Sequence, residues 1–420
     1  FHVLTLPIAK FQCIIMPDFM ELLNQRRFNM VSFFLKWRAM DIGRFELFEL
    51  ETMKVPQFSP WVGKEEYDSI KSCFDINWIT EGPKTSEFKD QLLKLTGAKF
   101  GVFAPNGTLA IYLGLKAMGV GSDDEVLVPD FTFIGTATAV EMAGARPVFV
   151  EVNRRNFQID TEKASAALTK KTRAIIPVHI YGTAVNMTAV CSFARAHNLV
   201  ILEDAAQGIG VYFNRKHVGT FGDTGIFSFF ADKTITTGEG GMVITNDENI
   251  YNKLLSLRNQ GRKDRGTFIH PEIGYNFRLT DIQSAIGLAQ LKKLDEIIDK
   301  KSKILETYKN FLSPVTQIKF FEKEPNANIV PFRVGILSDS AQELMNYISS
   351  KGIEARTFFY PLHRQPCFMN YKDQQGVNDE SFKNAIYGYE SGICLPSFPT
   401  ISTDQIEYVS SAIKAYYEQK

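Results

Sequence analysis

The stretch GIFSFFADKTITTGEGGMV, residues 225–243, places Lys233 directly after an apolar, strand-like segment. A loop containing Gly238, Gly240 and Gly241 follows the lysine. A lysine packed beside aromatic rings loses hydration, which lowers its pKa and makes the neutral amine a usable nucleophile. Most lysines are solvated surface residues, and this stretch alone leaves that alternative open for Lys233.

A second stretch upstream supplies a carboxylate. VILEDAAQ, residues 200–207, is typical of a buried strand that ends at Asp204. Open α/β sheets bind ligands at the carboxyl ends of their strands, although an Asp there can also simply cap the next helix. A buried Asp and a Lys in one crevice are what a pyridoxal phosphate (PLP) site requires. The lysine holds the cofactor and the aspartate keeps the ring nitrogen protonated.

Other residues suit the phosphate and the ring of such a cofactor. Asn106-Gly107-Thr108 begins a helix directly after a strand, so free backbone N–H groups and the helix dipole favour an anion there. Ser228 offers a further hydroxyl, and Phe133 offers a flat surface for stacking. An ordinary helix cap and a core phenylalanine remain the alternatives for these two features.

The pattern along the chain predicts the fold. Between residues 56 and 312, strand-like and helix-period segments alternate, which indicates an α/β domain with a large, mostly parallel sheet and helices on both faces. The amphipathic stretch 281–310 is expected to connect this domain to the rest. Beyond Ser313 the pattern predicts a smaller C-terminal α+β domain. We therefore expect a large domain at 53–312 and a small domain at 313–420.

Residues 1–52 differ from the rest of the sequence. They are rich in aromatic residues and Met without steady periodicity, and Met53 resembles a natural start. Their pattern is not that of a signal peptide. We expect an N-terminal extension of unknown role, either a remnant of cloning or readthrough, or an accessory segment.

Composition excludes several classes of function. The 420 residues contain 47 Lys plus Arg and 47 Asp plus Glu, so no basic excess favours nucleic acid. No apolar run is long enough for a membrane helix. The cysteines are Cys13, Cys73, Cys191, Cys367 and Cys394. They have neither the spacing of a disulfide framework nor that of a zinc site, so we expect a cytoplasmic protein with no metal centre.

From about Lys54 to its end the chain resembles the DegT/DnrJ sugar-nucleotide aminotransferases, which are PLP enzymes of fold type I. The matching motifs are NGT (106–108), DFTFIGT (130–136), HIYG (179–182), EDAAQ (203–207), SFFADK (228–233), GEGG (238–241) and GYNFRLTDIQ (274–283). Around Lys233 the sequence is most similar to GDP-perosamine synthases, which implies a 4-keto-6-deoxyhexose linked to a nucleotide.

The resemblance implies a role for each matched residue. Lys233 is the catalytic lysine that forms the Schiff base, Asp204 the partner of the ring nitrogen, and Gln207 a hydrogen-bond donor to the ring hydroxyl. Gly107, Thr108 and Ser228 bind phosphate, and Phe133 stacks on the ring. Asn276 reaches the phosphate of the neighbouring subunit in a homodimer with shared active sites. His363 is at a position of the substrate site, although a surface histidine is the alternative.

We therefore predict a PLP-dependent transaminase that moves an amino group from glutamate to a keto sugar nucleotide, with a role in polysaccharide biosynthesis. A PLP-dependent sugar dehydratase, or another carbonyl-exchange enzyme of this fold, is the first alternative. A non-catalytic regulatory protein is the second. Intact Lys233, Asp204 and Gln207 argue against the second, because a retired site has no physical need for all three.

Overall fold

The computed structural model describes residues 53–262, 266, 268–369 and 378–420, so the predicted extension Phe1–Thr52 lies outside the described residues. The α-helices are α3 (Lys64–Asp75), α4 (Pro83–Thr96), α5 (Gly107–Ala117), α6 (Gly135–Met142), α7 (Thr161–Ala166), α8 (Met187–Ala196), α9 (Glu248–Arg258), α10 (Asp281–Lys292), α11 (Leu294–Leu312), α12 (Ala341–Ser349), α14 (Lys383–Ser391) and α15 (Thr403–Glu418). Within the described ranges, no helix combines the length and apolar content needed to cross a membrane.

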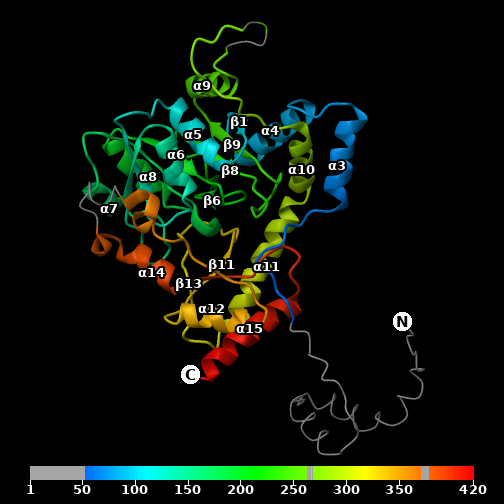
Figure 1. Ribbon diagram of the computed structural model, residues 1–420, viewed down its shortest axis with the longest axis vertical. Coiled ribbons are helices and arrows are strands. Elements are labelled where there is room, and N and C mark those ends of the chain that lie inside the picture. Colours follow the sequence, from blue (N-terminus) through cyan, green and yellow to red (C-terminus); the bar gives the residue numbers. More distant parts are fainter. Residues whose placement is uncertain (1–52, 263–265, 267, 370–377) are drawn as a thin grey trace, which may run out of the picture. The chain divides into compact units, whose positions relative to one another are not determined.

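A large sheet organises the first two thirds of the described chain (Figure 1). Its strand order is β1-β9-β8-β5-β4-β2-β3, and neighbours from β8 to β3 pair in parallel while β9 is antiparallel to both β1 and β8. The strands are β1 (Phe100–Ala104), β2 (Glu125–Pro129), β3 (Arg146–Val150), β4 (Thr172–Ile175), β5 (Val200–Asp204), β8 (Thr224–Ser228) and β9 (Gly241–Thr245). The prediction of a mostly parallel sheet is confirmed.

Both faces of this sheet are buried. Successive residues of β2 alternate between two core clusters, with Val126 and Val128 in one and Leu127 in the other. The first cluster also contains side chains of α5 and α6, and the second contains side chains of α4 and α8. A sheet covered on both faces leaves its strand ends as the accessible part. The sheet therefore offers its edge of strand ends, and not its faces, to ligands.

A smaller antiparallel sheet follows in the order β10-β11-β13-β12, with its own core. Its strands are β10 (Lys319–Phe320), β11 (Val334–Leu337), β12 (Arg356–Thr357) and β13 (Gly392–Leu395). Val55 pairs with Ile353 and lies in this core, so the first described residues pack on the small sheet although we expected the large domain to begin at residue 53. The boundary between the two predicted domains after residue 312 stays a proposal.

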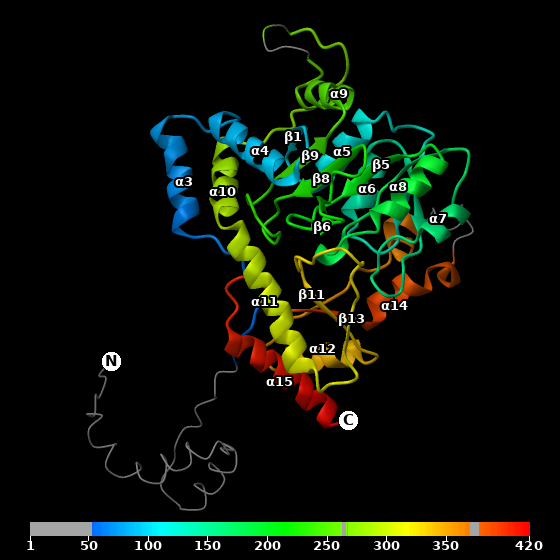
Figure 2. The same cartoon turned by 180° about the vertical axis from the view of Figure 1, so that it is seen from behind.

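The predicted connector 281–310 is two helices. Figures 1 and 2 show that α10 lies beside α3 and that α11 continues from α10 toward α15. Thr280 opens α10 through a capping box with Gln283, and Lys293 breaks the run with φ −108° and ψ 13°. Amphipathic periodicity continues through such a break, which is why the sequence indicated one stretch.

The sequence of residues 328–336 is strand-like and predicts one strand, but the strand that forms is shorter. Only Val334–Leu337 forms β11, whereas Val330 N–H donates to Gly182 O at 3.1 Å and Phe332 N–H to Tyr181 O at 3.1 Å. Pro331 between them has no N–H to donate, which favours this irregular pairing over a continuous ladder. The segment before β11 is thereby held against the loop after β4, beside the site described next.

The remaining described elements are short. They are a hairpin, formed by β6 (Tyr212–Phe213) and β7 (Lys216–His217), and the 3₁₀ turns η2 (Ile180–Gly182), η3 (Leu362–Arg364), η4 (Pro366–Phe368) and η5 (Asp379–Phe382).

Candidate active site

A cavity of about 710 Å³ lies where the parallel strands of the large sheet end. β5 and β8 end at Asp204 and Ser228. Because β9 runs the opposite way, the loop between β8 and β9 remains at this edge and carries Lys233 there. The predicted site residues that line this cavity are Gly107, Thr108, Phe133, Asp204, Gln207, Ser228 and Lys233.

Lys233 has the environment of a reactive amine. Its side chain is 16% exposed, and its Nζ lies 4.3 Å from the centre of the Phe332 ring and 3.9 Å from Asp232 Oδ1. Burial lowers the pKa of Lys233, and the charge of Arg333 acts in the same direction, while Asp232 and Asp204 oppose the shift. The amine is therefore easier to deprotonate than that of a surface lysine.

Asp204 is a buried carboxylate whose cationic neighbour in the cavity is Lys233. Its side chain accepts hydrogen bonds from Thr136 Oγ1 at 2.8 Å and from Ala206 N–H at 3.1 Å. Burial raises the pKa of Asp204, and these two hydrogen bonds only partly offset that effect. A cationic N–H group placed against Asp204 would be stabilised by the charged carboxylate.

The neighbouring Glu203 has a different role. Its carboxylate accepts backbone N–H groups of Gly219, Phe221 and Gly222 at 2.5–2.8 Å, and it contacts His179 Nε2 at 3.1 Å. Since Val185 N–H donates to His179 Nδ1, the proton of the neutral ring is on Nε2 and is donated to Glu203. Glu203 holds the loop before β8 and needs no ligand to satisfy it.

The start of α5 forms an anion cradle. The side chain of Asn106 caps the helix by accepting Leu109 N–H at 2.9 Å, so the N–H groups of Gly107 and Thr108 are left for a ligand. A methyl group on Gly107 would lie 3.0 Å from the Cβ of Ser228, closer than ordinary contacts. Glycine therefore lets the helix start and the serine hydroxyl approach the same point.

Two side chains are placed to hold a flat ring. Phe133 is 58% exposed although it lines the cavity, a large apolar face that a planar ligand would cover. Gln207 accepts Tyr181 N–H at 2.7 Å through Oε1, and its NH₂ group bonds to no described residue. That amide is free to donate to a ring substituent.

His363 lies outside this cavity lining. Its Nδ1 is 2.7 Å from Asp130 Oδ2, and its backbone N–H donates to Asp130 Oδ1 at 2.7 Å. His363 is 1% exposed, and Asp130 begins the loop that carries Phe133. A contact between His363 and a substrate stays a prediction, whereas its position ties η3 to the loop of the stacking phenylalanine.

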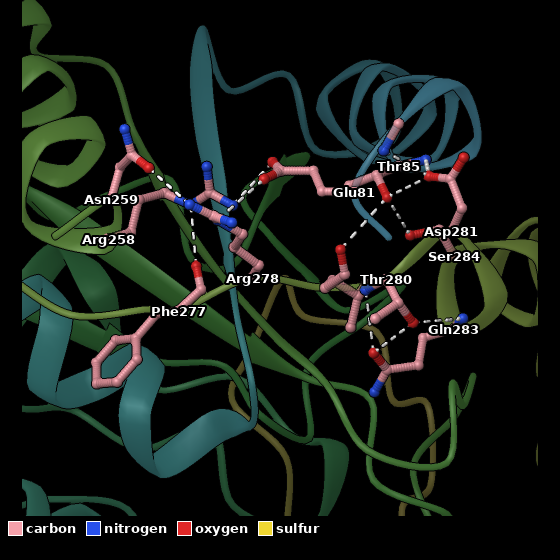
Figure 3. Close-up of polar contacts among 12 residues, drawn as sticks. Glu81, Thr85, Arg258, Asn259, Phe277, Arg278, Thr280, Asp281, Gln283 and Ser284 are labelled. Atoms are coloured by element: carbon pink, nitrogen blue, oxygen red, sulfur yellow. Dashed lines mark hydrogen bonds and ion pairs between the residues drawn. The ribbon is translucent and has the colours of Figure 1, made fainter. Parts of the chain in front are cut away.

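Asn276 also lies away from the cavity. It pairs with Asn259 in an isolated β-bridge and is exposed. Arg278, two residues further along the chain, takes part in the polar contacts of Figure 3. Glu81 binds Arg258 at 2.8 Å and lies 3.7 Å from Arg278, which donates to Asn259 Oδ1 at 2.7 Å. Asn276 is absent from the lining of the cavity of its own chain, and its role toward a neighbouring subunit stays a prediction.

Comparison with known proteins gives a family. The sequence profile of the DegT/DnrJ/EryC1/StrS aminotransferase family matches residues 60–414. The chain belongs to this family. It is 35% identical to GDP-perosamine synthase of Escherichia coli O157:H7, over 87% of this chain and 99% of that protein, and 34% identical to GDP-perosamine synthase of Vibrio cholerae, over 86% and 99%. Among solved structures, DesV of S. venezuelae in complex with a ketimine intermediate is 28% identical, with a TM-score of 0.82 over 87% of this chain and 99% of that one.

As a member of the DegT/DnrJ family the protein is a sugar aminotransferase that depends on PLP. The residues present fit this cofactor. Asp204 offers a buried carboxylate for the ring nitrogen, the start of α5 offers N–H groups for the phosphate, and Lys233 offers an amine with a lowered pKa. The predicted alternatives of a dehydratase and a regulatory protein give way to a transaminase.

Within this family fold, sequence reasoning assigned no role to several residues of the cavity. Thr136, the last residue of a matched motif, donates to Asp204. Tyr181 has φ 53° and stacks on Phe359 at 5.3 Å with the rings 4° from parallel. The motif position of Thr136 could have indicated its role, but nothing local in the sequence marks Arg333, which joins the cavity from the segment before β11.

Proposed function

We propose that the protein transfers the amino group of glutamate to a nucleotide-linked 4-keto-6-deoxyhexose, with a GDP sugar as the first candidate. The observation that carries the proposal is the meeting of the Lys233 amine, the Asp204 carboxylate and the helix cradle in one cavity. The two GDP-perosamine synthases at 34–35% identity support the choice of sugar.

PLP, when bound, supplies an electron sink that makes the Cα–H bond of the amino donor acidic. In our proposal the side chains around it manage protons and charge. Lys233 would hold the cofactor until the donor binds, and would then take the proton from Cα of the donor as general base and return it as general acid. Asp204 keeps the ring nitrogen protonated, and Gln207 donates to the ring hydroxyl.

The same groups serve the second half of the reaction in reverse order. The keto sugar receives the amino group and its carbonyl oxygen leaves as water. This replaces the water that is taken up when the donor is released as its keto acid, so the two half-reactions balance without any added oxidant. Lys233 returns the proton to the sugar carbon. The cavity is open to solvent beside Arg356 and Thr357, which leaves room for a nucleotide outside the reacting centre.

We further propose that the working unit is a homodimer in which Asn276 reaches the phosphate site of the partner. Exposed apolar side chains lie in the last turn of α3, in the segment that follows it and in the chain just before Asn276: Phe74 62%, Ile76 57%, Trp78 47%, Ile79 54% and Ile273 85%. Apolar side chains gathered in this way are typical of a protein interface. A second copy would cover them in a closed, twofold assembly.

The test of the function is a substrate screen. Purified protein loaded with PLP is incubated with glutamate and GDP-, UDP- or dTDP-linked 4-keto-6-deoxyhexoses, and the products are identified by mass spectrometry. We expect an amino sugar to form from the keto sugar that is linked to one of the three nucleotides, together with an equal amount of 2-oxoglutarate. Absence of an amino sugar with every substrate, from protein that binds PLP, would contradict the proposal.

A further inference from the structure

Helix α11 contains a buried lysine that the proposed chemistry does not use. Lys301 is 5% exposed, and its Nζ donates a hydrogen bond to Pro331 O at 3.2 Å. A protonated lysine has three N–H donors, and Lys301 makes no other hydrogen bond with a described residue. A buried ammonium group costs free energy unless neighbouring charges compensate it. The charges around Lys301 therefore decide what this side chain does.

A small pocket of about 20 Å³ places Lys301 next to the active site. Its lining includes Lys301, Asp232 and Lys233, and the last two also line the large cavity. Asp232 and Lys233 thus form part of the wall between the two spaces. Because Lys301 is absent from the lining of the large cavity, it approaches this wall from the side opposite the cavity.

Asp232 is the carboxylate that the surrounding cations share. Its Oδ2 forms an ion pair with Arg333 Nη2, and its Oδ1 lies 3.9 Å from Lys233 Nζ. Oδ1 is buried and has no hydrogen-bond partner among the described residues. A buried carboxylate favours the protonated form of an amine beside it. Asp232 alone would therefore keep a proton on Lys233, and a protonated amine is not a nucleophile.

Charged groups of several elements face the two lysines. Burial lowers the pKa of Lys233 and the charge of Arg333 adds to this effect, whereas Asp232 and Asp204 raise it. Burial lowers the pKa of Lys301 to about 8, the charges of Arg333 and Lys233 act in the same direction, and Asp232 opposes them. Repulsion between two cations is mutual, so a proton on Lys301 also disfavours a proton on Lys233.

We propose that the charge of Lys301 offsets that of Asp232 and thereby keeps the Lys233 amine free of a proton, an inference that rests on the proposed role of Lys233. Lys301 is then a positioning residue, which acts through Asp232 and touches neither cofactor nor substrate. Since Lys301 itself loses its proton at a pH of about 8, its effect is confined to lower pH.

The rate at which PLP attaches to the full chain stripped of cofactor tests this proposal, because only the neutral amine reacts. The rate is followed by the absorbance of the cofactor over a pH range on both sides of about 8. Borohydride reduction and peptide mass spectrometry then identify the labelled lysine. Lys301→Gln removes the charge and keeps an N–H donor, Lys301→Met removes both, and Lys301→Arg keeps both. Lys303→Gln is the matched control, because it removes a charge from the same helix at a side chain that is 74% exposed.

Below a pH of about 8, PLP should attach roughly tenfold more slowly to Lys301→Gln and Lys301→Met than to wild type, because one pKa unit on Lys233 changes the neutral fraction tenfold. Above that pH the difference should vanish, since wild-type Lys301 is then neutral as well. Lys301→Arg and Lys303→Gln should follow wild type below that pH.

The dependence on pH separates this effect from a structural one. Slowing of Lys301→Gln by the same factor at every pH would mean that Lys301 is only structural and would overturn the inference. Rates equal to wild type throughout would also overturn it. If the label is absent from Lys233 in wild type, the proposed role of Lys233 fails; if wild type is labelled there and the rates are equal, the inference alone fails.

Discussion

Adjacent carboxylates in the motif EDAAQ have unrelated tasks. Glu203 is satisfied by three backbone N–H groups and His179, while Asp204 faces the cavity with a pKa raised by burial. Alternation along β5 sends one side chain to each face of the sheet. The same chemical group is therefore part of the scaffold at one position and part of the active site at the next.

Replacing each carboxylate by its amide separates these tasks. Asp204→Asn should keep the fold and PLP but lose activity by on the order of a hundredfold or more, because an amide cannot keep the ring nitrogen protonated. Glu203→Gln should instead lower the free energy of unfolding by about 2 kcal/mol, because the amide presents one acceptor where the carboxylate presented two. Steady-state kinetics and urea unfolding measure the two effects. Activity of Asp204→Asn within a few-fold of wild type would assign Asp204 a structural role.

At the residue scale, the sequence predicted what local motifs encode. Asp204 ends a strand, and Lys233 and Gly107 each follow one. Strand ends of a parallel sheet meet at one edge, so the meeting of these residues in one cavity could be expected. Arg333 could not be expected. It comes from the irregular segment before β11, about a hundred residues after Lys233, and tertiary contacts such as the hydrogen bonds to Tyr181 and Gly182 place that segment there.

At the scale of elements, one side chain joins two helices that are far apart in the chain. Asp281, the first residue of α10, is fully buried and accepts the N–H groups of Gly82, Lys84 and Thr85 at 2.8–3.1 Å, and the Thr85 hydroxyl at 2.7 Å (Figure 3). α4 has no capping side chain of its own, so Asp281 caps it from a distance.

Asp281→Ala should therefore destabilise the protein by about 2–3 kcal/mol, because the buried N–H groups at the start of α4 lose their acceptor. Asp295→Ala, at an exposed position in the first turn of α11, is the matched control and should change stability by less than about 0.5 kcal/mol. Urea unfolding followed by circular dichroism compares them. Equal stability of the two variants would show that another group caps α4.

Elements with local signals were predicted closely, and those that depend on tertiary contacts were not. The local sequence pattern predicts a strand at 100–104, a helix at 135–142, a strand at 392–395 and a helix at 403–418, and β1, α6, β13 and α15 have these bounds. The pattern also predicts a strand at 353–358. Only β12 (Arg356–Thr357) forms there, because a ladder needs a partner strand and β13 pairs with just two of these residues.

At the scale of the whole molecule, the role proposed for Asn276 requires a partner subunit. The loop that carries it is fixed by the Glu81–Arg258 and Glu81–Arg278 contacts, yet Asn276 itself is exposed and away from the cavity of its own chain. A rigid loop with an unused polar tip is suited to completing a site in another subunit.

Mixing two inactive variants tests this arrangement. If Asn276 acts across the interface, a dimer of one Lys233→Ala chain and one Asn276→Asp chain has one site with both lesions and one intact site. Random pairing makes about half of the dimers mixed, so roughly a quarter of wild-type activity should return. If no activity returns although tagged chains show that subunits exchange, Asn276 either acts within its own chain or has no role in the reaction.

The buried carboxyl of Asp204 also links cofactor supply to acidity. An acid whose pKa is raised by folding binds a proton more tightly in the folded state, so its contribution to stability falls as the pH rises from the ordinary carboxyl range through the raised pKa. Over that pH range, the melting temperature of the protein without PLP should fall relative to that of Asp204→Asn without PLP. Binding of PLP should abolish this difference, because it neutralises the charge of Asp204. A chain without its cofactor would then be less stable at a pH above the raised pKa of Asp204 than at a pH below it, and binding of PLP would remove this dependence.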